Sequence, residues 1–89
     1  MNSFTTRRFR ERFSRLPSHL QKQTREAYRQ FLADSSHPGL RFKAISGHDN
    51  IWSARITLDY RAVCVLDGDT VTWFWIGSHS DYDKLLSKM

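Results

Sequence analysis

The chain of 89 residues contains one cysteine, two prolines and no long apolar run. A single cysteine excludes an internal disulfide, and Cys64 lies in the apolar segment 62–66, where we expect a small buried side chain in a reducing cytoplasm. Without a long apolar run, no membrane span is expected, and the arginine-rich start lacks the apolar core of a signal peptide. These absences predict a cytoplasmic protein with no membrane partner.

Acidic residues are scarce beside basic ones. The chain has 14 lysines and arginines against 9 aspartates and glutamates, a net charge of +5. A strongly basic surface on a small domain favours a nucleic acid or an acidic protein as the binding partner. A solvated basic face without a partner would give the same excess of basic residues. The length suits a single domain over residues 1–89, and an aromatic content of 13% favours a packed core over disorder.

The first third of the chain has the periodicity of two amphipathic helices. Phe9, Phe13 and Leu16 recur at helical spacing among five arginines, which predicts a helix of about ten residues that ends before Pro17. A second helix is expected from Ser18, which has the capping-box spacing to Gln21, until the turn-forming segment 34–39. Because both helices are too short to be stable alone, we expect them to pair as a hairpin on an apolar surface.

From residue 40 the pattern changes to the two-residue alternation of strands. Four strands are predicted, at 40–45, 51–57, 61–66 and 70–76, and Asp67-Gly68-Asp69 reads as a hairpin turn. The expected fold is therefore α+β: an N-terminal two-helix hairpin packed on a four-stranded antiparallel sheet, with a short C-terminal helix.

The segment 72–86 carries the densest functional signal. A strand of the kind buried on both faces ends at Gly77, and His79 follows before a short helix that Ser80 and Asp83 can cap. We expect His79 to lie partly exposed at the sheet edge. Because histidine exchanges protons near neutral pH, the position suits acid–base chemistry; a solvated or capping histidine is the alternative.

Three cationic side chains are expected near this histidine. Arg55 ends one strand and Arg61 begins the next, so both can share one end of the sheet with His79, and Lys43 can approach from the neighbouring strand. Arginines offer planar donors to phosphate oxygens, and an imidazole carries protons. The combination suits RNA cleavage by the adjacent 2′-hydroxyl. Ion pairs between the arginines and nearby aspartates are the alternative.

No metal or other cofactor is expected. Cleavage by a 2′-hydroxyl needs only a base, an acid and cationic side chains. The remaining histidines and the cysteine also lack ligand-like spacing; they are His19, His37, His48 and Cys64.

Five segments form a recognisable set, densest after Trp75: Leu16-Pro17, Phe42-Lys43, Trp52-Ser53-Ala54-Arg55, Asp59-Tyr60-Arg61-Ala62-Val63 and Trp75-Ile76-Gly77-Ser78-His79-Ser80-Asp81-Tyr82-Asp83-Lys84-Leu85-Leu86. In this layout they resemble the RelE/ParE superfamily of bacterial type II toxins over nearly the whole chain. The resemblance implies a two-helix hairpin on an antiparallel sheet and a cleft for messenger RNA in the ribosomal A site. It also implies a cognate antitoxin that wraps the toxin and blocks this cleft.

The resemblance assigns catalytic roles to four residues. Arg61 matches the arginine of the family's Tyr-Arg motif, thought to stabilise the transition-state phosphate, and Arg55 falls where RelE-type toxins carry a basic residue. His79 matches the catalytic histidine of the YafQ type, and Asp59 matches an acidic residue of that type.

Lys43, Tyr82 and Asp81 are the expected substrate contacts, and Tyr82 is the one counterpart of a tyrosine typical of some family C-termini. The chain departs from the family pattern in two places. Ser53 replaces a second basic residue, and the N-terminal strand that usually opens the fold is short or missing, since only residues 1–5 precede the first helix.

The leading functional hypothesis is a ribosome-dependent mRNA endonuclease that inhibits translation, favoured by His79 beside two arginines. One alternative is a ParE-like poison of DNA gyrase, which acts by binding and needs no proton-transfer site. Another is a non-catalytic basic RNA-binding module or degenerate toxin, which would bind RNA with a steep salt dependence.

Overall fold

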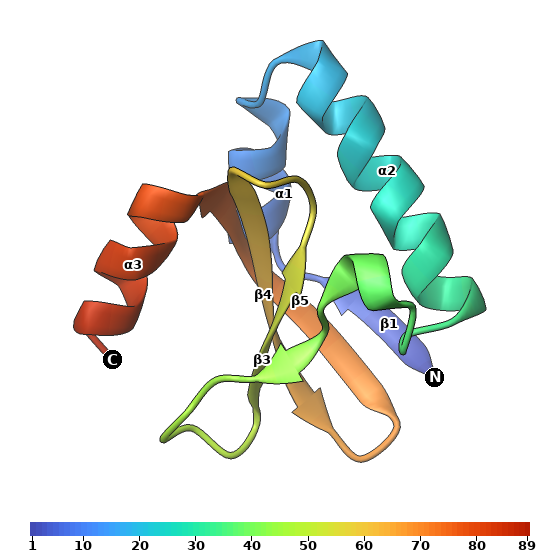
Figure 1. Ribbon diagram of the computed structural model, residues 1–89, viewed down its shortest axis with the longest axis vertical. Helices are drawn as coiled ribbons and strands as arrows, with labels where there is room; N and C mark the ends of the chain where they lie inside the picture. Colours follow the sequence, from blue (N-terminus) through green and yellow to red (C-terminus); the bar gives the residue numbers. More distant parts are fainter.

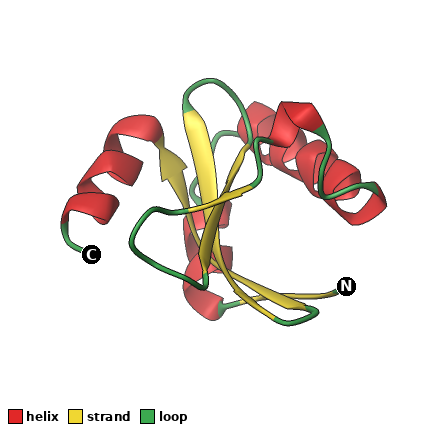
Figure 2. Cartoon of the chain, turned by 60° about the horizontal axis from the view of Figure 1, so that its bottom comes forward, coloured by secondary structure: helices red, strands yellow, loops and turns green.

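The computed structural model describes all 89 residues as an α+β fold with a five-stranded sheet of order β1-β5-β4-β3-β2. The strands are β1 (Asn2–Thr5), β2 (Lys43–Ala44), β3 (Ile51–Arg55), β4 (Tyr60–Asp67) and β5 (Thr70–Ser78), and the helices are α1 (Arg7–Ser14), α2 (Ser18–Ala33), the short 3-10 helix η1 (Pro38–Leu40) and α3 (His79–Ser87). Helices α1 and α2 cover one face of the sheet, and α3 lies against the other (Figures 1 and 2). No helix combines the length and apolar character needed to cross a membrane.

The sheet has one strand more than predicted, and it is not wholly antiparallel. Residues 2–5 form β1, which runs parallel to β5 with Asn2 opposite Thr70 and Thr5 opposite Trp73. The prediction of four antiparallel strands is wrong at this edge, although the other three pairings are antiparallel. No apolar alternation marks β1, because its main chain, rather than a buried face, holds it to β5.

The strand predicted at 40–45 is also largely wrong. Only Lys43 and Ala44 pair with β3. Leu40 instead ends η1 and is buried, and Arg41 adopts a left-handed backbone with φ 44°. A left-handed residue turns the chain, so the extended alternation cannot continue through it.

The N-terminal helices form where predicted, but their caps differ. Pro17, without a side-chain bond, precedes α2 where the Ser18 capping box was predicted. The Gln21 amide donates instead to the carbonyls of Phe13 and Leu16, at 3.2 and 3.1 Å. Gln21 thereby satisfies carbonyls left open at the end of α1. The two helices diverge from this connection (Figure 1), so the hairpin is splayed rather than closely paired.

The sheet buries apolar side chains on both faces, as predicted for β5. A bulge beside Val63 and Cys64 shifts the β4–β5 register, so that Cys64 lies opposite Trp73 and Val63 opposite Trp75. Trp73 therefore packs in the core beneath α1 and α2, while Trp75 packs beneath α3. The bulge reverses the alternation of β5 halfway along the strand.

Helix α1 covers the end of β5 that extends beyond β1. The Arg12 Nε donates to the Ile76 carbonyl at 2.7 Å, and the Arg12 guanidinium lies 4.8 Å from the centroid of the Trp75 ring. A Cβ atom at Gly77 would meet Trp75 Cη2 at 2.7 Å and Arg12 Nη2 at 2.8 Å. Only glycine fits at this position without displacing both neighbours.

We predict that Gly77→Ala lowers the free energy of unfolding by about 1–3 kcal/mol, because the added methyl group forces Trp75 or Arg12 to move. Urea denaturation measures the change. The control is Gly68→Asn in the β4–β5 turn, where φ is +58° and the space is open. Since asparagine tolerates this left-handed conformation, the control should change stability less. Equal losses would contradict the packing argument.

Cys64 is fully buried, and burial raises the pKa of its thiol to about 12. We predict that a thiol reagent at pH 8 labels Cys64 only at the rate at which the chain unfolds. The unfolded thiol ionises near its usual pKa of 9.0, but the folded thiol does not. Stability contributed by Cys64 is therefore lost as pH rises from about 9 to about 12. Fast labelling of the native protein would contradict this placement.

Candidate active site

A basic hollow of about 270 Å³ opens on the face of the sheet that carries α3. Its lining comes from the residue after η1, from β2, from the facing ends of β3 and β4, and from the first turn of α3: Arg41, Lys43, Ser53, Arg55, Arg61, His79 and Tyr82. Five of the predicted site residues therefore meet in one place.

Strand register brings the two arginines together. Arg55 and Arg61 are direct partners across β3 and β4, and Lys43 is the partner of Ser53 across β2 and β3. Partners in a ladder project from the same face of a sheet, so all four side chains point to the α3 side. The predicted proximity of Arg55, Arg61 and Lys43 is thus explained by pairing alone.

Arg61 is anchored by the loop that joins β3 to β4. Its Nη1 donates to the carbonyls of Thr57 at 2.8 Å and Tyr60 at 3.1 Å. Neither Nε nor Nη2 has a partner within the chain, so these donors are open to a ligand. Partial burial, followed by the positive charge of Arg55, lowers the pKa of Arg61 below its ordinary value. An anion placed between the two arginines would relieve both effects.

No carboxylate lines the hollow, whereas four of its side chains are cationic: Arg41, Lys43, Arg55 and Arg61. The ion pairs of the structure are Met1 with Asp69, Arg7 with Glu11 and His79 with Asp83, so neither Arg55 nor Arg61 is paired with an aspartate. Like charges opposite each other destabilise a sheet. Such an arrangement suits a site that binds an anionic ligand, because the ligand neutralises the cationic side chains.

His79 is the first residue of α3 and lies at the mouth of the hollow. Its main-chain N–H donates to the Asp59 carbonyl at 2.6 Å, which ties the helix start to the β3–β4 loop. Its Nδ1 lies 3.4 Å from Asp83 Oδ2 one turn later, and the side chain is 48% exposed. Asp83 can thus orient the imidazole, and Nε2 has no partner in the chain.

The cap of α3 differs from the prediction. Ser78, rather than Ser80, is the N-cap, and its Oγ accepts from the Asp81 N–H at 3.2 Å. The helix starts two residues earlier than the Ser80–Asp83 spacing indicated, which puts His79 on its first turn.

Two predicted site residues lie outside the hollow. Asp59 is exposed in the β3–β4 loop, and its contact with the site is the main-chain bond to His79. Asp81 is exposed on α3 and lines a separate hollow with Arg12 and Arg15. A direct catalytic role for Asp59 and a substrate contact for Asp81 stay predictions.

Three contributors were not predicted as site residues. Ser53 is buried at 3% exposure beneath the hollow, and its signal is that it shares the strand face of Arg55. Asp83 was considered only as a cap, although its spacing of four residues from His79 places both on one helix face. Arg41 gives no sequence signal, because a left-handed turn aims it at the site.

Comparison with known proteins places this geometry in a family. A family profile described as "ParE-like toxin domain" matches residues 18–84. A search of curated proteins found no match.

Solved structures share the fold over most of the chain. A chain of the RelB-RelE antitoxin-toxin complex from Methanococcus jannaschii is 21% identical with a TM-score of 0.70, covering 91% of this chain and 96% of that one. The YoeB/ParE toxin from Agrobacterium tumefaciens is 16% identical with a TM-score of 0.70, covering 89% and 99%. YafQ from E. coli is 9% identical with a TM-score of 0.65, covering 91% and 96%.

At these identities the structures establish a common fold, and the profile match establishes membership because it spans most of the sequence. The chain belongs to the family of ParE-like toxin domains and is a toxin of the RelE/ParE superfamily, whose members act in toxin–antitoxin systems.

Proposed function

We propose that this toxin is a ribosome-dependent endoribonuclease that cleaves mRNA in the ribosomal A site and so inhibits translation. The observation that carries the proposal is the convergence of Arg55, Arg61 and His79 on one open hollow without a carboxylate. An RNA phosphate supplies the negative charge that this hollow lacks. The resemblance to RelE-type and YafQ-type toxins supports the ribosomal A site as the place of action.

The proposed reaction needs only side chains of this chain and solvent. The 2′-oxygen bonds to phosphorus as the bond from phosphorus to the 5′-oxygen breaks, which yields a 2′,3′-cyclic phosphate and a 5′-hydroxyl. One proton leaves the 2′-hydroxyl, and another reaches the 5′-oxygen. His79 carries one of these protons through Nε2, and water in the open hollow carries the other.

The arginines stabilise the charge that builds on the phosphorane. Arg61 offers Nε and Nη2 from a position anchored by the Thr57 and Tyr60 carbonyls, and Arg55 lies directly across the ladder. Because the Arg61 guanidinium is anchored before the substrate arrives, little reorganisation of this group accompanies the reaction. Lys43 and Tyr82 complete the wall around the phosphate.

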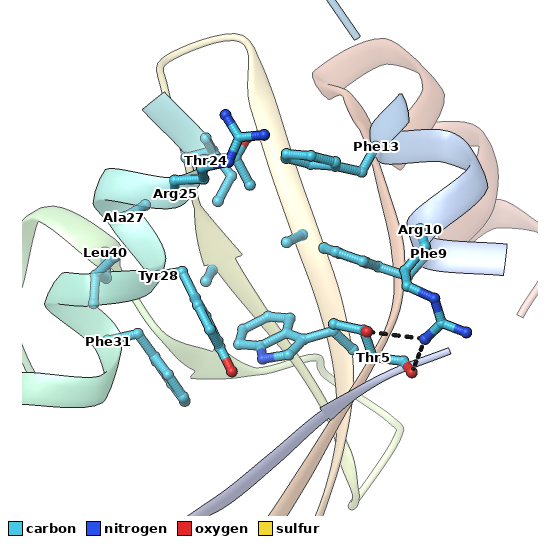
Figure 3. A pocket seen from close by; sticks show the side chains of 14 residues that line it. Thr5, Phe9, Arg10, Phe13, Thr24, Arg25, Ala27, Tyr28, Phe31 and Leu40 are labelled. Carbon is cyan, nitrogen blue, oxygen red and sulfur yellow. Dashed lines mark hydrogen bonds between the residues drawn. The ribbon is translucent and has the colours of Figure 1, made fainter. Parts of the chain in front are cut away.

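A cognate antitoxin is the proposed protein partner, supported by the shared fold with a chain of an antitoxin-toxin complex. Across the sheet from the basic hollow, an apolar groove of about 380 Å³ separates α1 from α2. Figure 3 shows Phe9 and Phe13 of α1 facing Ala27, Tyr28 and Phe31 of α2 across it. Such a groove fits the apolar face of a partner segment.

Two further features support an antitoxin in this groove. Trp73 contributes its indole ring to the apolar lining, which gives an apolar partner side chain an aromatic surface to pack on. Arg10 and Arg25 also line the groove, so cations stand at its edge beside the apolar walls. The groove therefore suits a segment that combines apolar and acidic side chains.

A poison of DNA gyrase is the second candidate function. It is favoured by the match to the family profile described as "ParE-like toxin domain". Such a toxin would arrest growth through binding alone, with transcripts intact and without dependence on His79. The nuclease is preferred because a grouped imidazole and guanidinium pair has no purpose in that mode of action.

We predict that Arg61→Ala and His79→Ala each lower the rate of mRNA cleavage in a translating extract by about 10²–10³-fold, through loss of charge stabilisation and proton transfer. Mapping transcript ends measures the rate, and the products should carry a 5′-hydroxyl. The matched controls are Arg29→Ala and His19→Ala, both exposed on α2, which should cleave like the unsubstituted protein. Cleavage unchanged in both site variants would refute the site. Arrest with intact transcripts would favour gyrase.

We predict that Phe13→Lys weakens antitoxin binding by about tenfold or more, because it removes an apolar wall and sets a second cation beside Arg25. The Arg25 guanidinium now lies 5.2 Å from the centroid of the Phe13 ring. Titration calorimetry with the purified antitoxin measures the change. Phe4→Lys is the control, since Phe4 is exposed on β1 outside the groove. Equal affinities of the two variants would place the antitoxin elsewhere.

A further inference from the structure

A second hollow of about 420 Å³ adjoins the basic one, between the β2–β3 loop and α3. It is lined by Lys43, Ala44, Ile45, Ser46, His48, Tyr82 and Leu86. Lys43 and Tyr82 line both hollows and form their common wall. A ligand held in the basic hollow can therefore extend into the second one without leaving the surface.

The lining of this second hollow changes from apolar to polar. Ile45 and Leu86 are half-buried against the Val63–Trp75–Tyr82 cluster, which gives one wall that is apolar and fixed. Ser46 and His48 come from the loop and add a hydroxyl and an imidazole. An apolar wall with hydrogen-bonding groups beside it matches a nucleobase, which has apolar faces and a polar edge.

His48 is held in place while its side chain stays uncommitted. Its main-chain N–H donates to the Ile45 carbonyl at 3.1 Å, and its carbonyl accepts from the Ile51 N–H at 3.3 Å. Gly47, at φ +84°, allows this tight loop. The imidazole is half-buried and has no partner in the chain, so it is available to a ligand.

Two hollows that share a wall suit an RNA strand, in which each phosphate is followed directly by a sugar and its base. Lys43 lies in the ladder opposite Ser53, on the α3 side, where its ammonium can reach the phosphate that joins two nucleotides. Tyr82 is buried, with its ring packed 6.3 Å from Trp75 and 5.9 Å from His79 between centroids. Its ring thus gives both hollows a rigid boundary.

We propose that the second hollow binds the base of a nucleotide that flanks the cleaved linkage, and that His48 and Ser46 contact its polar edge. These contacts help to set which codons are cut. The inference rests on the proposed ribonuclease function and adds to it a site for base selection that is separate from the groups that handle the phosphate.

The first test compares transcript ends produced by the unsubstituted toxin, by a Ser46→Ala/His48→Ala double variant and by His19→Ala. Losing the edge contacts should change the ratio of cleavage between codons that differ at one base by about tenfold, since each base contact contributes discrimination of this order. His19→Ala, on α2, should leave the ratios unchanged. Ratios in the double variant that equal those of the unsubstituted toxin would overturn the proposal.

A second measurement separates failure of the pocket from failure of the nuclease. Amide resonances of the labelled protein are followed during titration with inorganic phosphate and then with a 2′-deoxy dinucleoside monophosphate, which cannot be cleaved. We expect phosphate to shift the resonances of Arg55 and Arg61, and the dinucleotide to shift those of residues 44–48 and Leu86 as well.

The outcomes distinguish the two ideas. If the toxin cleaves no RNA but the dinucleotide shifts the amide resonances of residues 44–48, the proposed nuclease function is refuted and the proposed base pocket is supported. If the toxin cleaves RNA but the dinucleotide shifts only the resonances that phosphate shifts, the proposed base pocket is refuted and the proposed nuclease function is supported.

Discussion

The antiparallel register of β3, β4 and β5 is the constraint on which the rest of the molecule depends. Two rows of this ladder, Ser53 opposite Val63 opposite Trp75 and Arg55 opposite Arg61 opposite Gly77, lie on the same face. The first row is buried and supplies packing, whereas the second carries two cations side by side at the sheet's end. Hydrophobic burial in one row therefore keeps together the like charges of the other, which would separate if they were free to do so.

The two faces of the sheet separate two kinds of chemistry. The face beneath α1 and α2 is apolar and forms a groove because the helices diverge, while the face beneath α3 is cationic at one end. The bulge in β5 makes this possible by sending Trp73 to one face and Trp75 to the other. The groove proposed for the antitoxin and the hollow proposed for phosphate chemistry thus lie on opposite sides of one sheet, and an antitoxin that wraps the toxin would contact both.

Local pattern predicted which basic side chains lie together better than it predicted the sheet. Alternation in β3 and β4 placed Arg55 and Arg61 near each other, and the strand-to-helix junction placed His79 beside them, because short-range pairing decides these positions. The parallel strand β1 was missed because its neighbour β5 lies about seventy residues away in the chain. Arg41 was missed because its direction depends on a left-handed turn that no periodicity reveals.

The sequence by itself determined the α+β class, the approximate positions of most elements and the residue types that a phosphate site requires, since propensity and periodicity are properties of neighbouring residues. The tertiary structure alone decided that Arg41 joins the basic hollow, that Asp59 meets His79 through its main chain, and that α1 and α2 stand apart. These outcomes depend on side-chain directions and distances between segments far apart in the chain, and such distances arise only when the core packs.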